Sequence, residues 1–401
     1  MSFRFGIDVL LNDPKLLAEL KNKKLSLVAH PASVNGELTH TIDALFNAGL
    51  KLSSAFGPQH GIHGEKQYNM IETPDQLDPK YHIPIFSLYG KVRKPTAEMM
   101  SSFDLVLIDL QDVGTRIYTY LTTLFYMLEA AHEFKKTVWI LDRPNPIGRP
   151  IEGSLLTKGF TSFVGCAEGL PMRHGLTLGE FAHYFKKSLK LDCEIKVVKM
   201  QDYRMDLAPG FGWPQKSWVN PSPNAPSLSM ARCYPGTVLI EGTHLSEGRG
   251  TTRPLEIVGA PDIDAEKILQ KMQAYKSNWL EGCKLRTCYF EPTFYKYKEN
   301  TCHAMQIHVD DSSHYQHEKF KPYRVMALWF KALRSLYPDY QIWRDFPYEY
   351  VTDRLAFDVI NGGIFMRTWI EDAAAGPGDL DKVFLRDEKE WRERSKEYHL
   401  Y

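Results

Sequence analysis

Acidic side chains follow several apolar runs of this chain, at positions where a strand would end. The candidate carboxylates are Glu65, Asp109, Asp112, Asp142, Glu241 and Glu247. Two carboxyl groups are what hydrolysis of a glycosidic bond requires, one to protonate the leaving oxygen and one to act as base or nucleophile on the other face. Asp109 and Asp142 close their runs directly, and we expect them to bond neighbouring backbone amides. Asp112 lies four residues before Arg116, so a helix beginning at this turn would pair the two charges, which suits a base better than an acid.

The densest polar segment is 240–254, which contains Glu241, Glu247, Arg249 and Arg253. An Arg guanidinium binds a carboxylate through two parallel hydrogen bonds, so Arg249 and Arg253 suit an anionic substrate. The alternative is a buried salt-bridge network that anchors one domain to the other. In the Asn-Pro-Ser-Pro-Asn segment just upstream, the prolines would present Asn220 and Asn224 rigidly to hydroxyl or acetamido groups.

His60 and His63 lie three residues apart with Glu65 close behind, a spacing that suggests a metal site. Glycines at 57, 61 and 64 disfavour a rigid helix here, so we favour a substrate-contacting loop and keep a metal-dependent hydrolase as the weaker alternative. We expect no cofactor, because the glycine patterns of dinucleotide-binding and phosphate-binding loops are absent. The Gly-x-Ser-x-Gly pattern of a serine hydrolase is absent as well.

The charge balance excludes some partners. Lys and Arg number 49 and Asp and Glu number 49, so no net charge attracts nucleic acid or an anionic membrane. No apolar run reaches membrane-spanning length. None of the six cysteines forms a Cys-x-x-Cys pair, so we expect no structural zinc and predict buried free thiols, with one disulfide in the second half as the alternative.

Strand and helix patterns alternate through the first half. The expected strands are 25–30, 53–56, 83–88, 104–110, 137–142 and 193–199, and the expected helices are 41–48, 118–134 and 178–189. Nearly continuous apolar runs such as 104–110 are typical of strands covered on both faces. The order predicts an α/β fold with a Rossmann-like, mostly parallel sheet and helices on both faces. Ligands bind beyond the carboxyl ends of such strands.

The pattern changes in the second half. An irregular segment, 209–226, precedes an expected strand at 234–241. Helices at 262–275 and 322–337 and strands at 285–290 and 304–309 then indicate a smaller α+β domain. We therefore predict a Rossmann-like catalytic domain over 1–260 and a C-terminal α+β domain over 261–401 that closes the cleft.

Several motifs, in order along about three-quarters of the chain, carry a family resemblance. They are Gly57–Gly61 with Glu65, Tyr89–Pro95, Gln111–Tyr120, Leu141–Pro146, Arg173–Gly175, Pro221–Asn224, Tyr234–Thr237 and Glu241–Pro254. Together they resemble a bacterial family, long described as a domain of unknown function, of exo-β-N-acetylmuramidases. These glycoside hydrolases release N-acetylmuramic acid from the non-reducing ends of peptidoglycan fragments.

The resemblance implies an active site in the cleft between a Rossmann-like domain and a smaller one, with the Arg pair holding the lactyl carboxylate of muramic acid. We expect the catalytic residues to be Glu65, Asp112, Glu247 and His60. The expected substrate-binding residues are Gln59, His63, Arg116, Tyr118, Arg143, Asn145, Asn220, Ser222, Asn224, Glu241, Arg249 and Arg253. No metal and no cofactor is expected.

One position departs from the family pattern. The family usually has a glutamate where this chain has Gln59, and that glutamate is a leading candidate for the catalytic acid. Either Glu65 or Glu247 takes the acid role here, or the family assignment of that role is wrong, or this member has changed substrate or lost activity. A non-catalytic binder of cell-wall sugars on the same fold is therefore the alternative function. A periplasmic or extracellular location is slightly favoured over a cytoplasmic one, and the oligomeric state is left open.

Overall fold

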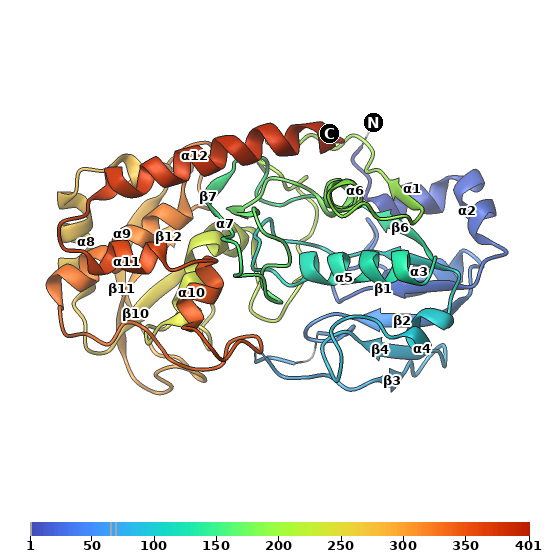
Figure 1. Ribbon diagram of the computed structural model, residues 1–401, viewed down its shortest axis with the longest axis horizontal. Helices are drawn as coiled ribbons and strands as arrows, with labels where there is room; N and C mark the ends of the chain where they lie inside the picture. Colours follow the sequence, from blue (N-terminus) through green and yellow to red (C-terminus); the bar gives the residue numbers. More distant parts are fainter. Residues whose placement is uncertain (1, 65, 69) are drawn as a thin grey trace.

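A seven-stranded sheet in the order β3-β4-β2-β1-β5-β6-β9 forms the centre of the N-terminal half (Figure 1). The computed structural model describes residues 2–64, 66–68 and 70–401. The strands are β1 (Leu25–Val28), β2 (Leu52–Gly57), β3 (Gln76–Leu77), β4 (Pro84–Ser87), β5 (Leu105–Ile108), β6 (Thr137–Leu141) and β9 (Ile195–Val198). All neighbours run parallel except β3, which is antiparallel to β4. The predicted mostly parallel α/β sheet is confirmed.

Successive residues of the central strands pack into different cores on the two faces of the sheet. Along β5, Leu105 and Leu107 join one core, and Val106 and Ile108 join the other. The first core includes helices α1 (Gly6–Asn12), α2 (Pro14–Leu20) and α3 (Thr41–Asn47), and the second includes α4 (Ala97–Ser101), α5 (Tyr120–Glu133) and α6 (Leu178–Ser188). Because both faces are covered, these strands are apolar throughout rather than alternating.

The C-terminal half is built on a three-stranded antiparallel sheet. Its order is β10 (Ile257–Ala260), β12 (Cys302–His308) and β11 (Lys284–Phe290), with α8 (Ala265–Ala274) and α9 (Pro322–Leu336) packed together beside it. The remaining elements are the β7 (Glu152–Leu155) and β8 (Pro171–Arg173) pair, helices α10 (Ala356–Asn361), α11 (Phe365–Glu371) and α12 (Pro377–Ser395), and the short turns η2 (Asn278–Leu280) and η3 (Lys396–Tyr398). The boundary near residue 260 stays a prediction.

The strand expected at 234–241 is wrong, because this segment is helical. It contains the end of α7 (Leu228–Thr237) and most of the 3-10 turn η1 (Val238–Gly242). The Ser227 hydroxyl caps α7 by accepting from the Met230 amide at 3.0 Å. A Cβ at Gly236 would lie 2.0 Å from the Pro322 carbonyl oxygen, so α7 lies directly against the start of α9. A short apolar run buried on all sides cannot be assigned to helix or strand by periodicity alone.

Helix α12 crosses from the C-terminal half back over the N-terminal half (Figure 1). Arg324, buried in α9, donates to Asp381 at 2.9 Å and to Glu388 at 2.5 Å, both on α12. Asp387 of the same helix accepts from the Leu155 amide at 3.0 Å. Hydrogen-bonded ion pairs in a buried setting specify position more than they add net stability. The helix is therefore fixed in register against both halves.

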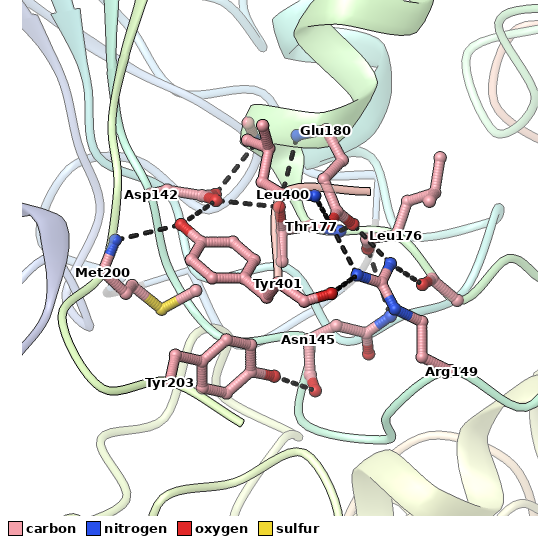
Figure 2. Close-up of polar contacts among 12 residues, drawn as sticks. Asp142, Asn145, Arg149, Leu176, Thr177, Glu180, Met200, Tyr203, Leu400 and Tyr401 are labelled. Atoms are coloured by element: carbon pink, nitrogen blue, oxygen red, sulfur yellow. Dashed lines mark hydrogen bonds and ion pairs between the residues drawn. The ribbon is translucent and has the colours of Figure 1, made fainter. Parts of the chain in front are cut away.

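The segment after α12 reaches the edge of the central sheet (Figure 2). The Tyr401 hydroxyl donates to Asp142 Oδ2 at 2.8 Å and accepts from the Met200 amide at 2.9 Å. The Leu400 amide donates to Glu180 at 2.7 Å. Burial raises the pKa of Asp142 to about 6, although its hydrogen bonds favour the charged form. These contacts anchor the C-terminal residues, which follow α12, to the N-terminal half.

No helix within residues 2–64, 66–68 and 70–401 is long and apolar enough to span a bilayer. All six cysteines lie in the described part and are free thiols, so the alternative of a disulfide in the second half is not realised.

Tyr401→Phe tests the contact between Tyr401 and the sheet edge. We expect the free energy of unfolding to fall by about 1–3 kcal/mol, because the Met200 amide and Asp142 each lose a partner in a partly buried site. Urea denaturation followed by circular dichroism measures the change. Tyr289→Phe is the control, since Tyr289 is 71% exposed. Equal stability of the two variants would contradict a stabilising role for the Tyr401 hydroxyl.

Candidate active site

A cavity of about 450 Å³, partly open to solvent, lies where loops after β2 and β5 meet residues of the C-terminal half. Its lining residues are Gln59, His60, Ile117, Tyr118, Thr119, Val164, Ser222, Asn224, Met230, Tyr234, Glu241, Arg249, Leu255, Tyr348 and Glu349. We call this the inner cavity.

Glu349 is a carboxylic acid poised near neutral pH at the wall of the inner cavity. It is 4% exposed, and its two oxygens accept from Gln59 Nε2 at 3.2 Å and from the Tyr89 hydroxyl at 2.8 Å. Burial raises the pKa of Glu349 to about 7 against the opposite effect of these hydrogen bonds, and repulsion from Glu241 adds to the rise. The group is therefore divided between its acid and carboxylate forms at neutral pH, as a proton donor requires.

The backbone at Glu349 is a tight turn held in an unusual conformation. Tyr348 and Val351 exchange backbone hydrogen bonds of 3.1 and 3.0 Å, and between them Glu349 and Tyr350 have φ values of 45° and 70°. Two positive φ values define a type I′ turn, which usually contains Gly, Asn or Asp. Non-glycine residues in this region cost of order 1–3 kcal/mol each and persist where their surroundings hold them. Here Tyr89 and Gln59 hold the Glu349 side chain.

Four charged side chains form a buried network, part of which lines the same cavity. Arg249 Nη2 lies 2.6 Å from Glu241 and its Nε lies 3.0 Å from Glu247, which also bonds Lys296 at 3.0 Å. Burial alone would raise the pKa of Glu247, but Lys296 and Arg249 outweigh it and lower that pKa. The salt-bridge network considered from the sequence is therefore present, and its four formal charges cancel.

Only part of this network faces the inner cavity. Glu241 and Arg249 belong to the lining, and Glu241 also accepts from the Tyr348 hydroxyl at 2.7 Å. Glu247, expected to be catalytic, is fully buried and does not belong to the lining.

Seven residues predicted from the sequence meet at the inner cavity. They are Gln59, His60, Tyr118, Ser222, Asn224, Glu241 and Arg249. The Tyr118 hydroxyl is buried and has no hydrogen-bond partner among the described residues. His60 Nδ1 lies 2.8 Å from the Lys66 carbonyl, so this nitrogen carries the proton and Nε2 is an acceptor. Burial lowers the pKa of His60 to about 4, so the ring is neutral at physiological pH.

The ion pair expected between Asp112 and Arg116 is wrong, because the turn after β5 does not begin a helix. Asp112 accepts from the Gly114 amide at 2.6 Å and lies 3.3 Å from His174 Nε2. Arg116 is fully buried and donates to four backbone carbonyls, those of Ser154, Leu170, Ile360 and Asn361. Neither side chain belongs to the cavity lining.

Arg143 and Asn145 are engaged in holding the loop after β6. Arg143 Nε pairs with Asp109 at 2.5 Å, and Asn145 donates to the Leu176 carbonyl at 3.1 Å. Asp142 accepts from the Gly179 amide at 2.9 Å, which confirms its expected bond to backbone, whereas Asp109 pairs with Arg143 and Thr41. These contacts position the sheet edge and do not line the inner cavity.

Three other predicted residues, His63, Asn220 and Arg253, are exposed and lie outside the cavity lining. Arg253 pairs with Glu256 at 3.1 Å. Glu65 lies outside the described residues, and its role stays a prediction. Within the described ranges, the one group of three side chains spaced to hold a metal is Asp206, His317 and Glu318, none of which lines the cavity.

No pattern in the sequence indicated Glu349 or its partner Tyr89 as site residues. Glu349 follows no apolar strand run, and Tyr89 lies in a quoted motif as an ordinary aromatic residue. Thr119 and Tyr234 also lie in quoted motifs and line the inner cavity. The Tyr-Glu-Tyr sequence at 348–350 lacks the glycine or asparagine that usually identifies a type I′ turn.

Comparisons with known proteins agree along the whole chain. A family model described as exo-beta-N-acetylmuramidase NamZ, N-terminal, matches residues 25–229, and its C-terminal counterpart matches residues 232–401. The chain is 37% identical over 398 residues to the peptidoglycan beta-N-acetylmuramidase NamZ of Bacillus subtilis (strain 168), covering 99% of this chain and 91% of the relative.

Solved structures give the same result for the fold. One protein of Bacteroides fragilis, described as a DUF1343 family protein, superposes with a TM-score of 0.84 at 29% identity, covering 100% of this chain and 99% of that one. A second DUF1343 family protein of the same organism has a TM-score of 0.77 at 24% identity, with coverage of 100% and 99%. The chain thus belongs to the exo-β-N-acetylmuramidase family.

Proposed function

We propose that this enzyme releases N-acetylmuramic acid from the non-reducing ends of peptidoglycan fragments, with Glu349 as the general acid. The observation that carries the proposal is a buried carboxyl group with a pKa of about 7 on the wall of a cavity lined by polar side chains. An acid with this pKa keeps a large protonated fraction at neutral pH and still transfers its proton readily. The relative from Bacillus subtilis, a peptidoglycan beta-N-acetylmuramidase, supports the substrate class.

Glu241 is the second carboxylate of the proposed mechanism. It lies on the same cavity, in an ion pair with Arg249 at 2.6 Å. A glycosidase needs one carboxyl group as acid and a second as base or nucleophile, in environments that separate their roles. Glu349 supplies its proton to the leaving oxygen as the bond from the anomeric carbon to that oxygen breaks. Glu241 stabilises the positive charge that develops on the ring. Water then bonds to the anomeric carbon and gives up a proton to the Glu349 carboxylate, which restores the acid.

Arg249 is the residue we propose for the lactyl carboxylate. Its Nε and Nη2 donate to Glu247 and Glu241, and these two bonds leave the two hydrogens of Nη1 and one of Nη2 as further donors. The two glutamates hold the guanidinium in one orientation at the cavity wall. Asn224 and Ser222 supply polar groups for the acetamido group, and the Tyr118 hydroxyl is a further donor to the sugar.

The alternative of a non-catalytic binder rests on Gln59 replacing the usual glutamate. Gln59 donates to Glu349 and accepts from the Thr119 hydroxyl at 2.9 Å, so its amide orients a carboxyl group supplied by another segment. The replacement therefore leaves the cavity with an acid.

Glu349→Gln tests the assignment of the acid. We expect kcat/KM for a muramic acid–N-acetylglucosamine disaccharide to fall about 10²- to 10⁴-fold, the usual contribution of a general acid. A 4-nitrophenyl muramide should lose much less, because its leaving group needs little protonation. Glu98→Gln, at an exposed position on α4, is the matched control. Equal losses on both substrates would show that Glu349 has another role.

The pH dependence provides an independent test. Because the acid form of Glu349 is required, kcat/KM should fall as pH rises through about 7, the pKa of this group. Gln59→Glu should move this fall to higher pH, since two carboxyl groups at hydrogen-bond distance share one proton and the second ionisation is suppressed. If Gln59→Glu leaves the pH at which kcat/KM falls unchanged, the assignment of Glu349 as the acid is contradicted. No release by the parent, with release gained in Gln59→Glu, would favour the binder.

Arg249→Lys tests recognition of the lactyl carboxylate while it keeps the positive charge between two buried glutamates. We expect the parent to bind N-acetylmuramic acid more tightly than its methyl ester by about tenfold or more, the usual worth of a charge-assisted hydrogen bond. The variant should lose most of this ratio, because lysine lacks the planar fork. Inhibition constants for the two sugars measure it. A ratio unchanged in the variant would assign the carboxylate to another residue.

A further inference from the structure

A second hollow, which we call the outer groove, opens beside the inner cavity. It has an empty volume of about 710 Å³, part of it open solvent, against about 450 Å³ for the inner cavity. Its walls include Gln67, Asn224, Thr251, Thr252, Thr293 and Phe294. Asn224 lines both spaces. Neighbouring residues are also divided between them, since Arg249 and Leu255 line the inner cavity while Gly250 and Pro254 line the groove.

The groove has walls fixed by contacts between distant segments. Asn224 donates to the Gln67 carbonyl at 3.1 Å and accepts from Gln67 Nε2 at 3.3 Å. The Thr293 amide donates to the Gly250 carbonyl at 3.0 Å. At Gly250, with φ of 84°, a Cβ would lie 2.8 Å from the Thr293 amide nitrogen, so the two loops touch backbone to backbone. The walls of the groove are therefore held in place by hydrogen bonds and by close backbone contact.

The chemistry of the groove differs from that of the inner cavity. No ionisable side chain occurs among the described residues that line the groove, whereas Glu241, Arg249 and Glu349 line the cavity. The rings of Phe294 and Tyr68 meet edge to face, with their centroids 5.2 Å apart, and Tyr68 is 43% exposed. Aromatic rings beside threonine hydroxyls and an amide suit a neutral ligand with both apolar faces and hydroxyl groups.

We propose that the outer groove binds the uncharged amino sugar on the leaving-group side of the scissile bond, an inference that rests on the proposed function. A disaccharide would then place its anionic sugar against the charged wall of the inner cavity and its neutral sugar against Phe294 and the threonines. The change in lining charge from one space to the next matches the change in charge from one sugar to the next. The groove is a specificity site for the leaving group.

Phe294→Ala tests this proposal. We expect kcat/KM for the muramic acid–N-acetylglucosamine disaccharide to fall about tenfold, in line with the loss of an aromatic contact, and kcat/KM for the 4-nitrophenyl muramide to change less than about twofold. Ligand-observed NMR should show N-acetylglucosamine binding to the parent and lost from the variant. Tyr289→Ala, which removes an aromatic ring 71% exposed on β11, is the control. If Phe294→Ala lowers the urea midpoint, Phe294→Leu removes the ring face and keeps the bulk.

The outcomes separate the two proposals. Parent activity on both substrates with equal loss, or no loss, in the Phe294 variants would overturn the groove alone. A loss seen only with peptide-bearing substrates would assign the groove to the peptide stem and overturn the sugar assignment. No release from either substrate by the parent, together with no N-acetylglucosamine binding, would overturn both proposals.

Discussion

The carboxyl group of Glu349 is supplied by the C-terminal half and is held by hydrogen-bond donors from the N-terminal half. Tyr89 and Gln59 reach it from the loops after β4 and β2, at 2.8 and 3.2 Å. Its burial, which raises the pKa to about 7, depends on the same docking of one half against the other. The loops after β2 and β4 and the strained turn at 348–351 together bring this one group to its position. The acid is a property of the interface rather than of either half.

The inner cavity places its two carboxyl groups, those of Glu241 and Glu349, in different environments. Glu241 is held by the Arg249 guanidinium, whereas Glu349 has only neutral donors as hydrogen-bond partners. Separating the environments of two acids is the usual way to obtain an acid and a base from the same residue type. Glu247 and Lys296 complete the arrangement, because together they leave the network with no net charge to destabilise the buried site.

The sequence predicted the fold better than it predicted the site, for reasons that particular residues illustrate. Buried parallel strands such as β5 and β6 are local apolar runs, so they can be recognised without tertiary information. The segment 234–241 could not, because its helical form depends on close contact with α9 at Gly236. Asp112 and Arg116 have a spacing that fits a helical ion pair, yet the helix begins only at Tyr120.

The same limit applies to the cavity. Seven of its residues were found, because they lie after strands, in the Asn-Pro-Ser-Pro-Asn segment at 220–224 or in the 240–254 segment. Arg116 was misread because a guanidinium satisfied by four backbone carbonyls is indistinguishable, in sequence, from one that binds a ligand. Glu349 was missed because its hydrogen-bond partner Gln59 lies 290 positions away in the sequence. Such a contact has no local pattern.

The return of the chain along α12 also constrains how the molecule can move. The chain passes into the C-terminal half and comes back along α12, so that Tyr401 rests against Asp142 at the edge of the central sheet. The two halves are thus connected twice: where the chain first enters the C-terminal half, and where its last residue contacts the N-terminal half. A wide hinge opening between the halves would have to break the contact between Tyr401 and Asp142. Separating the halves would leave Asp142 and the Met200 amide without the Tyr401 hydroxyl, and this loss opposes a wide opening.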